Sequence, residues 1–188
     1  LAWLAASACW RARVNSAGVV SDKGGIPISN ATGAQELPSV AYDGNKVLVT
    51  WRNRADRLVK GARITTSGNL LDYSGITISS AMAGSSGTAV AGLANNFMVC
   101  WSTLSATDSD VLSTVVTTSG IVRTPAGTPT SIGLMDQSDY SVSDNGTEYA
   151  VVWSQMVGGY RRIMGARISH AGAVLTASPI NITSTSTG

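Results

Sequence analysis

Arginines gather at two short stretches that could bind an anionic partner. The first contains Arg54 and Arg57, and the second contains Arg161 and Arg162. Guanidinium groups pair with carboxylates and phosphates through two parallel hydrogen bonds, so we expect these four residues to contact an anionic glycan, polymer or protein. Ordinary solvated charge at the tips of hairpins is the simpler alternative, and it stays open because the net charge is only +2.

The residue types that usually perform catalysis do not form a set in this sequence. The single histidine, His170, stands beside the turn glycine Gly172 and is expected to be exposed. Asp43 and Asn145 occupy corresponding turns, where such side chains cap backbone groups. We therefore expect no catalytic residue, no metal site and no cofactor.

Composition places the chain among globular domains with an uncharged surface. Of its 188 residues, 44% are hydrophobic but only 13% are charged, about half the usual charged share. The low net charge gives little attraction to nucleic acid, and no apolar run reaches the length of a membrane span. Cys9 and Cys100 are expected to be separate packed thiols, although a disulfide stays possible.

A repeat of about 50 residues organises the whole chain. Tryptophans recur at intervals of 48, 50 and 52 residues, and glycines recur at intervals of 50, 52 and 52. Because two residue types keep the same period, chance is a poor explanation. The residues that carry the period are Trp3, Trp51, Trp101 and Trp153, and Gly18, Gly68, Gly120 and Gly172.

Each full unit reads as four short β-strands. In the second unit, alternating β-branched residues predict strands over 38–42, 47–51, 58–66 and 76–79, separated by Asp-Gly and Ser-Gly turns. No segment shows a sustained helical period. The chain is therefore expected to be all-β.

The hairpin between the second and third strands varies in length by even steps. From the tryptophan to the aligned arginine position, the spacing is 10, 12, 14 and 14 residues in the four units. Adding one residue to each arm keeps every cross-strand pair and facing direction, whereas an odd change would turn one partner to the wrong face. The arginines Arg13, Arg63 and Arg167, together with the four tryptophans, are therefore expected to form the structural repeat core, and Val115 replaces the arginine in the third unit.

Four-stranded antiparallel units of this length are typical of a β-propeller. We expect a single domain over 1–188 with about four blades, at 1–35, 36–84, 85–136 and 137–188. The first blade lacks its innermost strand. An open β-repeat array or a solenoid is the alternative.

The motifs Pro-x-Val-Ala-x-Asp-Gly, Val-x-Trp and Gly-Ala-Arg-Ile resemble a repeat of secreted bacterial β-propeller proteins. The best match runs from Pro38 to Ile64, and the fourth unit matches over 142–168. The third unit departs at Ala94, which replaces the turn glycine, and at Val115. The resemblance implies the fold and an extracellular or cell-surface setting, but no activity.

A non-enzymatic propeller that acts as a binding or structural scaffold is the main functional hypothesis. Its ligand is expected to be a protein or a glycan, held at the hairpin tips or on a propeller face. Copies of the chain could also associate through the incomplete first blade. The alternative is a hydrolase or lyase that acts on polysaccharide, which requires clustered Asp, Glu, Arg or His at one end of the propeller axis.

Overall fold

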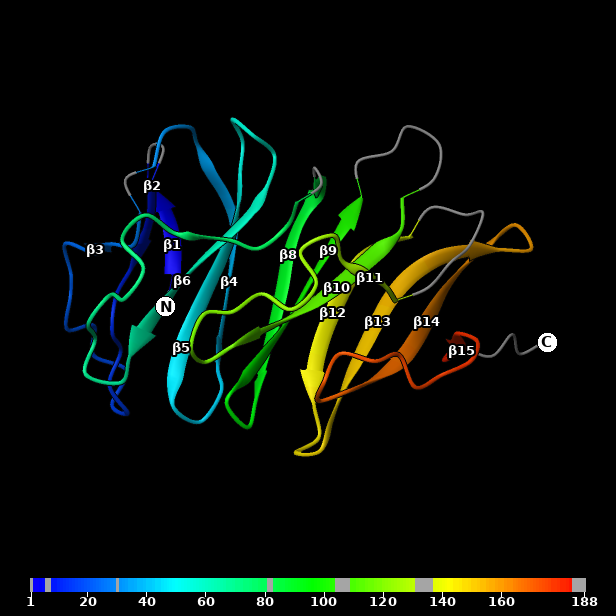
Figure 1. Cartoon of the computed structure of the whole chain (residues 1–188). Helices are drawn as coiled ribbons and strands as arrows, with labels where there is room; N and C mark the ends of the chain where they lie inside the picture. The colour runs from blue at the N-terminus through cyan, green and yellow to red at the C-terminus, as the bar shows by residue number, and fades with distance from the viewer. Residues whose placement is uncertain are drawn as a thin grey trace.

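The computed structural model describes residues 2–5, 8–29, 31–80, 83–103, 109–130 and 137–183. Throughout these ranges every regular element is a β-strand, and the strands form four antiparallel sheets. The sheets follow the chain from one end of the molecule to the other (Figure 1). The prediction of an all-β β-propeller with four-stranded blades is confirmed, and the ring of blades is open in the part of the chain that the structure describes.

Sequence order equals strand order in every blade, because each strand pairs with the next along the chain. Blade 1 has three described strands: β1 (Ala2–Ala5), β2 (Ala8–Arg11) and β3 (Ile26–Pro27). Blade 2 contains β4 (Gln35–Tyr42), β5 (Lys46–Asn53), β6 (Val59–Thr65) and β7 (Ile76–Thr77). Blade 3 contains β8 (Ala83–Leu93), β9 (Asn96–Thr103), β10 (Val111–Thr117) and β11 (Thr128–Pro129). Blade 4 contains β12 (Gln137–Asp144), β13 (Glu148–Val157), β14 (Tyr160–Ser169) and β15 (Ile180–Asn181).

The strand register explains why the hairpins change length only by even steps. In each blade the repeated tryptophan pairs with the residue three positions before the arginine position. The pairs are Trp3 with Trp10, Trp51 with Lys60, Trp101 with Leu112 and Trp153 with Met164. The prediction of constant pairing is confirmed, since lengthening both arms equally leaves each side chain on its own face.

The innermost strands begin earlier than the sequence indicated and contain an unpredicted bulge. The innermost strand of blade 2 begins at Gln35, three residues before the predicted start at residue 38, and that of blade 3 begins at Ala83. The register shifts in β4, β8 and β12 at aligned places. At each bulge one residue has a positive φ angle: Leu37 at 53°, Gly87 at 84° and Asp139 at 51°.

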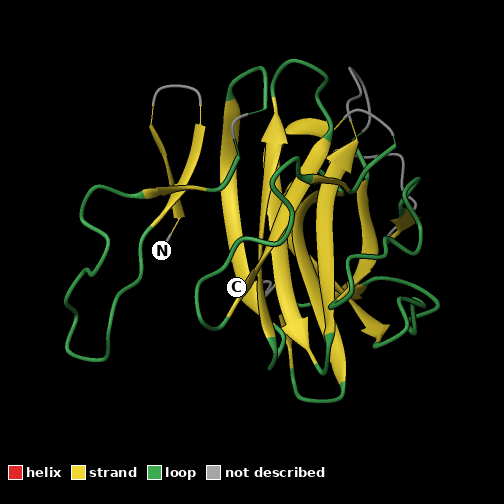
Figure 2. Cartoon of the chain, turned by 60° about the vertical axis from the view of Figure 1, so that its left-hand side comes forward, coloured by secondary structure: helices red, strands yellow, loops and turns green. Residues whose placement is uncertain are grey.

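The core lies between the blades, and the second view shows the sheets standing face to face (Figure 2). One apolar cluster joins blades 3 and 4, a second joins blades 2 and 3, and a smaller one joins blades 1 and 2. A single antiparallel sheet cannot bury both of its faces, so stacking of blades provides the burial that holds the fold together.

The turn between the third and fourth strands is the same in all four blades. Gly18, Gly68, Gly120 and Gly172 have φ angles of 77°, 91°, 90° and 94°. In every case the glycine N–H donates to the carbonyl oxygen three residues earlier. A side chain at these positions would be strained, which explains why the glycines keep the period.

Candidate ligand-binding edge

All four arginines predicted to bind a ligand lie along one edge of the molecule. We name it the hairpin edge, because the β5–β6 and β13–β14 hairpin tips and the starts of β4 and β12 form it (Figure 1, upper side). The opposite edge carries the β4–β5, β8–β9 and β12–β13 turns, and we name it the turn edge. The repeat therefore places on one edge two arginine groups that are about 100 residues apart in the sequence, with blade 3 between them.

In blade 2 a carboxylate lies between two arginines. The Nη1 atom of Arg52 is 2.8 Å from Oε2 of Glu36, and Nη1 of Arg54 is 3.5 Å from its Oε1. The Arg52 side chain is 11% exposed and the Arg54 side chain 72% exposed. Arg52 is therefore part of the framework, while the head group of Arg54 is largely available to solvent.

A backbone hydrogen bond to blade 3 and an ion pair hold the tip of the same hairpin. Arg57 has a positive φ of 57°, and its carbonyl oxygen accepts a hydrogen bond of 2.7 Å from the backbone N–H of Ala83 in blade 3. Asp56 pairs with Lys60 at 3.1 Å. The side chain of Arg57 is exposed, so its backbone has a structural role and its guanidinium faces water.

A cavity of about 310 Å³ lies beneath this tip. Polar side chains and the edge of a buried tryptophan line it, namely Thr32, Trp51, Asn53, Asp56, Lys60 and Ser74. Its size is at the lower end of the range for small-ligand sites. The hydroxyl, amide, carboxylate and ammonium groups of this lining suit a sugar better than an apolar ligand.

In blade 4 the second arginine group has polar partners. Arg161 donates from Nη1 to the hydroxyl oxygens of Ser138, at 2.9 Å, and Ser154, at 2.8 Å. Asp139 lies 3.8 Å away, and the Arg161 side chain remains 58% exposed. Arg162 stands on the other face of β14, where its Nε atom is buried. Arg161 thus resembles Arg54, whereas Arg162 is mostly framework.

The repeated tryptophans are buried between blades. Trp51, Trp101 and Trp153 are at most 1% exposed, so these three residues do not form a ring of ligand-binding side chains. The side chain of Trp3 lies outside the described side chains.

The repeated arginines form ion pairs instead of lining a site. Arg63 donates from Nε and Nη2 to the two carboxylate oxygens of Asp72, at 2.8 and 2.7 Å. Its Nη1 atom donates to the carbonyl oxygen of Thr118 in blade 3. Arg13 pairs with Asp22 in the same way, and Arg167 pairs with Glu148 on the neighbouring strand. The arginine thus keeps its position in the strand register from blade to blade, but its acidic partner is an aspartate in blades 1 and 2 and a glutamate in blade 4.

These pairs change the pKa values of the acids. Hydrogen bonds from the Arg13 guanidinium hold the pKa of Asp22 well below its usual range, and the Arg167 guanidinium lowers the pKa of Glu148. Burial raises the pKa of Asp72, but the hydrogen bonds from Arg63 outweigh it, so the net pKa is lowered. These three acids therefore stay deprotonated near neutral pH. This suits structural ion pairs and does not suit proton transfer.

Buried glutamines that connect blades were missed from the sequence. The Oε1 atom of Gln35 accepts from the backbone N–H of Cys9 in blade 1 at 2.6 Å. Gln137 accepts in the same way from Val111 of blade 3 at 3.0 Å. The signal was present, since the two glutamines are 102 residues apart, which is two repeat periods.

The expectation that His170 is exposed is wrong. Its Nε2 atom lies 3.1 and 3.2 Å from the carbonyl oxygens of Leu93 and Ala94 in blade 3, and its side chain is half-buried. The imidazole thus supports a turn in which Ala94 and Asn95 both have positive φ angles. Its role is to connect blades 3 and 4.

The cysteines are unpaired, and burial raises the pKa of Cys9 to about 11 and that of Cys100 to about 12. Among the described residues no group of three or more His, Cys, Asp or Glu side chains could hold a metal ion. In the same part of the chain no helix has the length and hydropathy needed to span a membrane. As predicted, the turn side chains Asp43 and Asn145 accept hydrogen bonds from the backbone of their own turns.

Comparison with known proteins identifies the fold. No family model and no curated protein matches the chain. An α-L-arabinofuranosidase from Lactobacillus brevis superposes with a TM-score of 0.55 at 11% identity, over 94% of this chain and 67% of that protein. A thermostable family-43 glycoside hydrolase gives a TM-score of 0.40 at 13% identity, over 80% of this chain and 54% of that protein. At 11% identity, the likeness to the arabinofuranosidase shows the β-propeller fold alone.

Proposed function

We propose that this chain is an extracellular β-propeller module that binds an acidic polysaccharide along its hairpin edge. The observation that carries the proposal is the position of Arg54 and Arg161. Both have largely exposed head groups, both are anchored near an inner strand, and both lie on the same edge. Arg57 adds a third exposed guanidinium beside the first.

Anchoring makes these arginines better ligands for an anion than free surface side chains. A side chain already held in one place loses less conformational entropy on binding. Around the β5–β6 tip there are four cations and two carboxylates, as Arg52, Arg54, Arg57 and Lys60 are offset by Glu36 and Asp56. A uronic acid carboxylate would bind an exposed guanidinium, while the neighbouring cavity of about 310 Å³ would take a sugar ring.

Polysaccharide hydrolysis is the second candidate, and the fold comparison favours it more than a non-enzymatic role. Retaining and inverting hydrolases need two carboxyl groups about 5 to 10 Å apart. At the hairpin edge Glu36 and Asp139 begin the inner strands of blades 2 and 4. Each of these carboxylates pairs with an arginine, however, and blade 3 packs between blades 2 and 4.

Binding of polygalacturonate, measured by isothermal titration calorimetry, tests the first proposal. Substituting Arg54→Ala together with Arg161→Ala should weaken binding at least about tenfold, and rising salt should weaken it further. The double variant Arg123→Ala with Arg167→Ala removes the same charge away from the hairpin edge and should bind as the wild type does. Equal losses in the two variants would show that net charge alone attracts the polymer and would contradict the proposal.

Release of reducing sugar from arabinan and polygalacturonate separates the two candidates. If the chain hydrolyses either polymer, Glu36→Gln and Asp139→Asn should each abolish release while binding persists. Binding without any release of sugar would exclude hydrolysis and leave the binding module.

A further inference from the structure

At two of the interfaces between blades, side chains from the same two positions of the repeat fill the space. At the interface of blades 2 and 3, Leu48 is fully buried and packs with Ala41 in a cluster that includes Val90, Phe97 and Val99. Here the two inner strands of blade 2 supply one small and one large aliphatic side chain to the next blade.

The interface of blades 3 and 4 repeats this arrangement. Met98 and Ala91 take the aligned positions and pack in a cluster with Val142, Tyr149 and Val151. Met98 is fully buried and Ala91 is 7% exposed. The pattern is therefore a property of the repeat.

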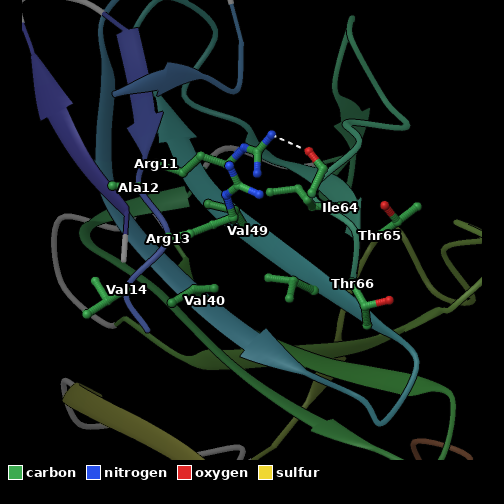
Figure 3. Close-up of a pocket in the computed structure, with 11 residues that line it drawn as sticks. Arg11, Ala12, Arg13, Val14, Val40, Val49, Ile64, Thr65 and Thr66 are labelled. Carbon is green, nitrogen blue, oxygen red and sulfur yellow. Dashed lines mark hydrogen bonds between the residues drawn. The ribbon is translucent and has the colours of Figure 1, made fainter. Parts of the chain in front are cut away.

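At the interface of blades 1 and 2, blade 2 presents the same apolar surface, but the described part of blade 1 supplies no small and large aliphatic pair to cover it. Val40 is 46% exposed, whereas its counterparts Val90 and Val142 are each 9% exposed. A cavity of about 270 Å³ lies at this place, with Val40, Val47, Val49 and Ile64 on its apolar side (Figure 3). No described residue of blade 1 stands at the positions of Ala41 and Leu48.

Strand β1 has a free edge beside the same cavity. Within the described part of the chain, β1 pairs only with β2. The corresponding strands β5, β9 and β13 each pair with an inner strand as well. Unpaired N–H and C=O groups along a strand accept another strand readily.

One donor on the polar side of the cavity has no hydrogen-bond partner. Arg11 stands where blades 2 and 4 have Gly61 and Gly165, and it is only 8% exposed. Its Nη2 donates to the carbonyl oxygen of Gly68 at 2.5 Å, but its buried Nε atom has no partner. Figure 3 shows its guanidinium next to that of Arg13 at the cavity.

We propose that the cavity and the free edge of β1 together form a docking site for a β-hairpin with this chain's own inner-strand pattern. The hairpin would place a small residue against Val40 and a large aliphatic residue in the cavity, as Ala41 and Leu48 do one blade further along. The site would continue the interfaces already present between the blades, and it does not depend on polysaccharide binding at the hairpin edge.

A labelled peptide with the sequence of Ala34–Leu48 tests this proposal by fluorescence anisotropy with the whole chain. Saturable binding is expected. Leu48→Asp in the peptide should weaken binding on the order of tenfold or more, because it buries a charge in an apolar cavity. The matched control is Val47→Asp in the peptide, since this neighbouring side chain faces the other side of the blade. It should leave binding unchanged.

Changes in the protein provide an independent measurement. Val40→Asp should abolish peptide binding, while Tyr73→Asp, at a side chain that is 72% exposed and does not line the cavity, should not. Thermal unfolding of both variants checks that they fold. Absence of saturable binding by the wild type, or equal effects of the two peptide changes, would overturn the proposal. A concentration-dependent dimer that the peptide does not dissociate would assign the surface to a second copy and also overturn it.

Discussion

Arginine has two different roles in this molecule, and burial separates them. Arg63 lies between blades 2 and 3 with a side chain that is 15% exposed, and it forms three hydrogen bonds to Asp72 and Thr118. Arg54 has one long contact and is 72% exposed. Desolvated, fully bonded guanidinium groups hold structure, whereas exposed ones remain free to bind a ligand.

Removal of the Arg63 side chain should therefore destabilise the fold. In Arg63→Ala the partly buried carboxylate of Asp72 loses its partner, and we expect a loss of roughly 1–3 kcal/mol in the free energy of unfolding. Urea unfolding measures it. Arg167→Ala is the control, because that arginine is 57% exposed and its pair with Glu148 is solvated. An equally large loss of unfolding free energy in Arg167→Ala would contradict the distinction between structural and exposed arginines.

Stability should fall in acid because the Arg63–Asp72 ion pair requires a deprotonated Asp72. The pKa of Asp72 is lower in the folded state than in the unfolded state, so the folded state binds fewer protons. The stabilisation is complete above the unfolded carboxyl pKa of about 4 and is lost as pH falls below it. Urea midpoints measured from pH 7 down to pH 3 should show this decline, and Asp72→Asn should reduce its slope. An unchanged slope in that variant would contradict the assignment.

Among the elements, the hairpins could be predicted from sequence but the bulges could not. Even steps in hairpin length reveal a fixed register, because pairing in a sheet has a period of two. A bulge inserts one unpaired residue and leaves no compositional mark. Here the bulge residue is Leu37 in β4, Gly87 in β8 and Asp139 in β12, three residue types with nothing in common.

The bulge of β8 should tolerate no side chain. Gly87 has a φ of 84°, and an added Cβ atom would lie 2.8 Å from Cβ of Leu37 on the neighbouring inner strand. Gly87→Ala combines backbone strain with this clash, so we expect a loss of more than about 2 kcal/mol.

The matched control is Gly158→Ala in the β13–β14 turn. Its φ is 60° and nothing lies within 4 Å of the added Cβ atom, so only backbone strain remains, about 1 kcal/mol. Equal losses in the two variants, measured by thermal unfolding, would show that the inner-strand contact contributes nothing.

At the scale of the whole molecule, the repeat predicts the blades but not which interfaces are filled. Periodic tryptophans and glycines were sufficient for the four-stranded units. The difference between Val40 and its counterparts Val90 and Val142 depends on the neighbouring blade, which no local pattern records. The same limit explains the error at His170, whose partners Leu93 and Ala94 belong to another blade.

The position of the hairpin edge likewise follows from the whole fold. Arg54 and Arg161 are 107 residues apart in the sequence, and they share an edge because blades 2 and 4 repeat the same strand order. The sequence predicted these arginines as ligand-binding residues at hairpin tips, and their side chains are 72% and 58% exposed. It could not show that Glu36 and Ser138 anchor them, since those partners lie on other strands.

Amide chemical-shift mapping during titration with polygalacturonate tests ligand binding at the hairpin edge most directly. Saturable shifts should concentrate at 52–57 and 158–162 and at the starts of β4 and β12, with the β4–β5 and β12–β13 turns unchanged. Shifts centred on the turn edge, or no saturable shifts in either region, would contradict the assignment of the hairpin edge as the binding surface.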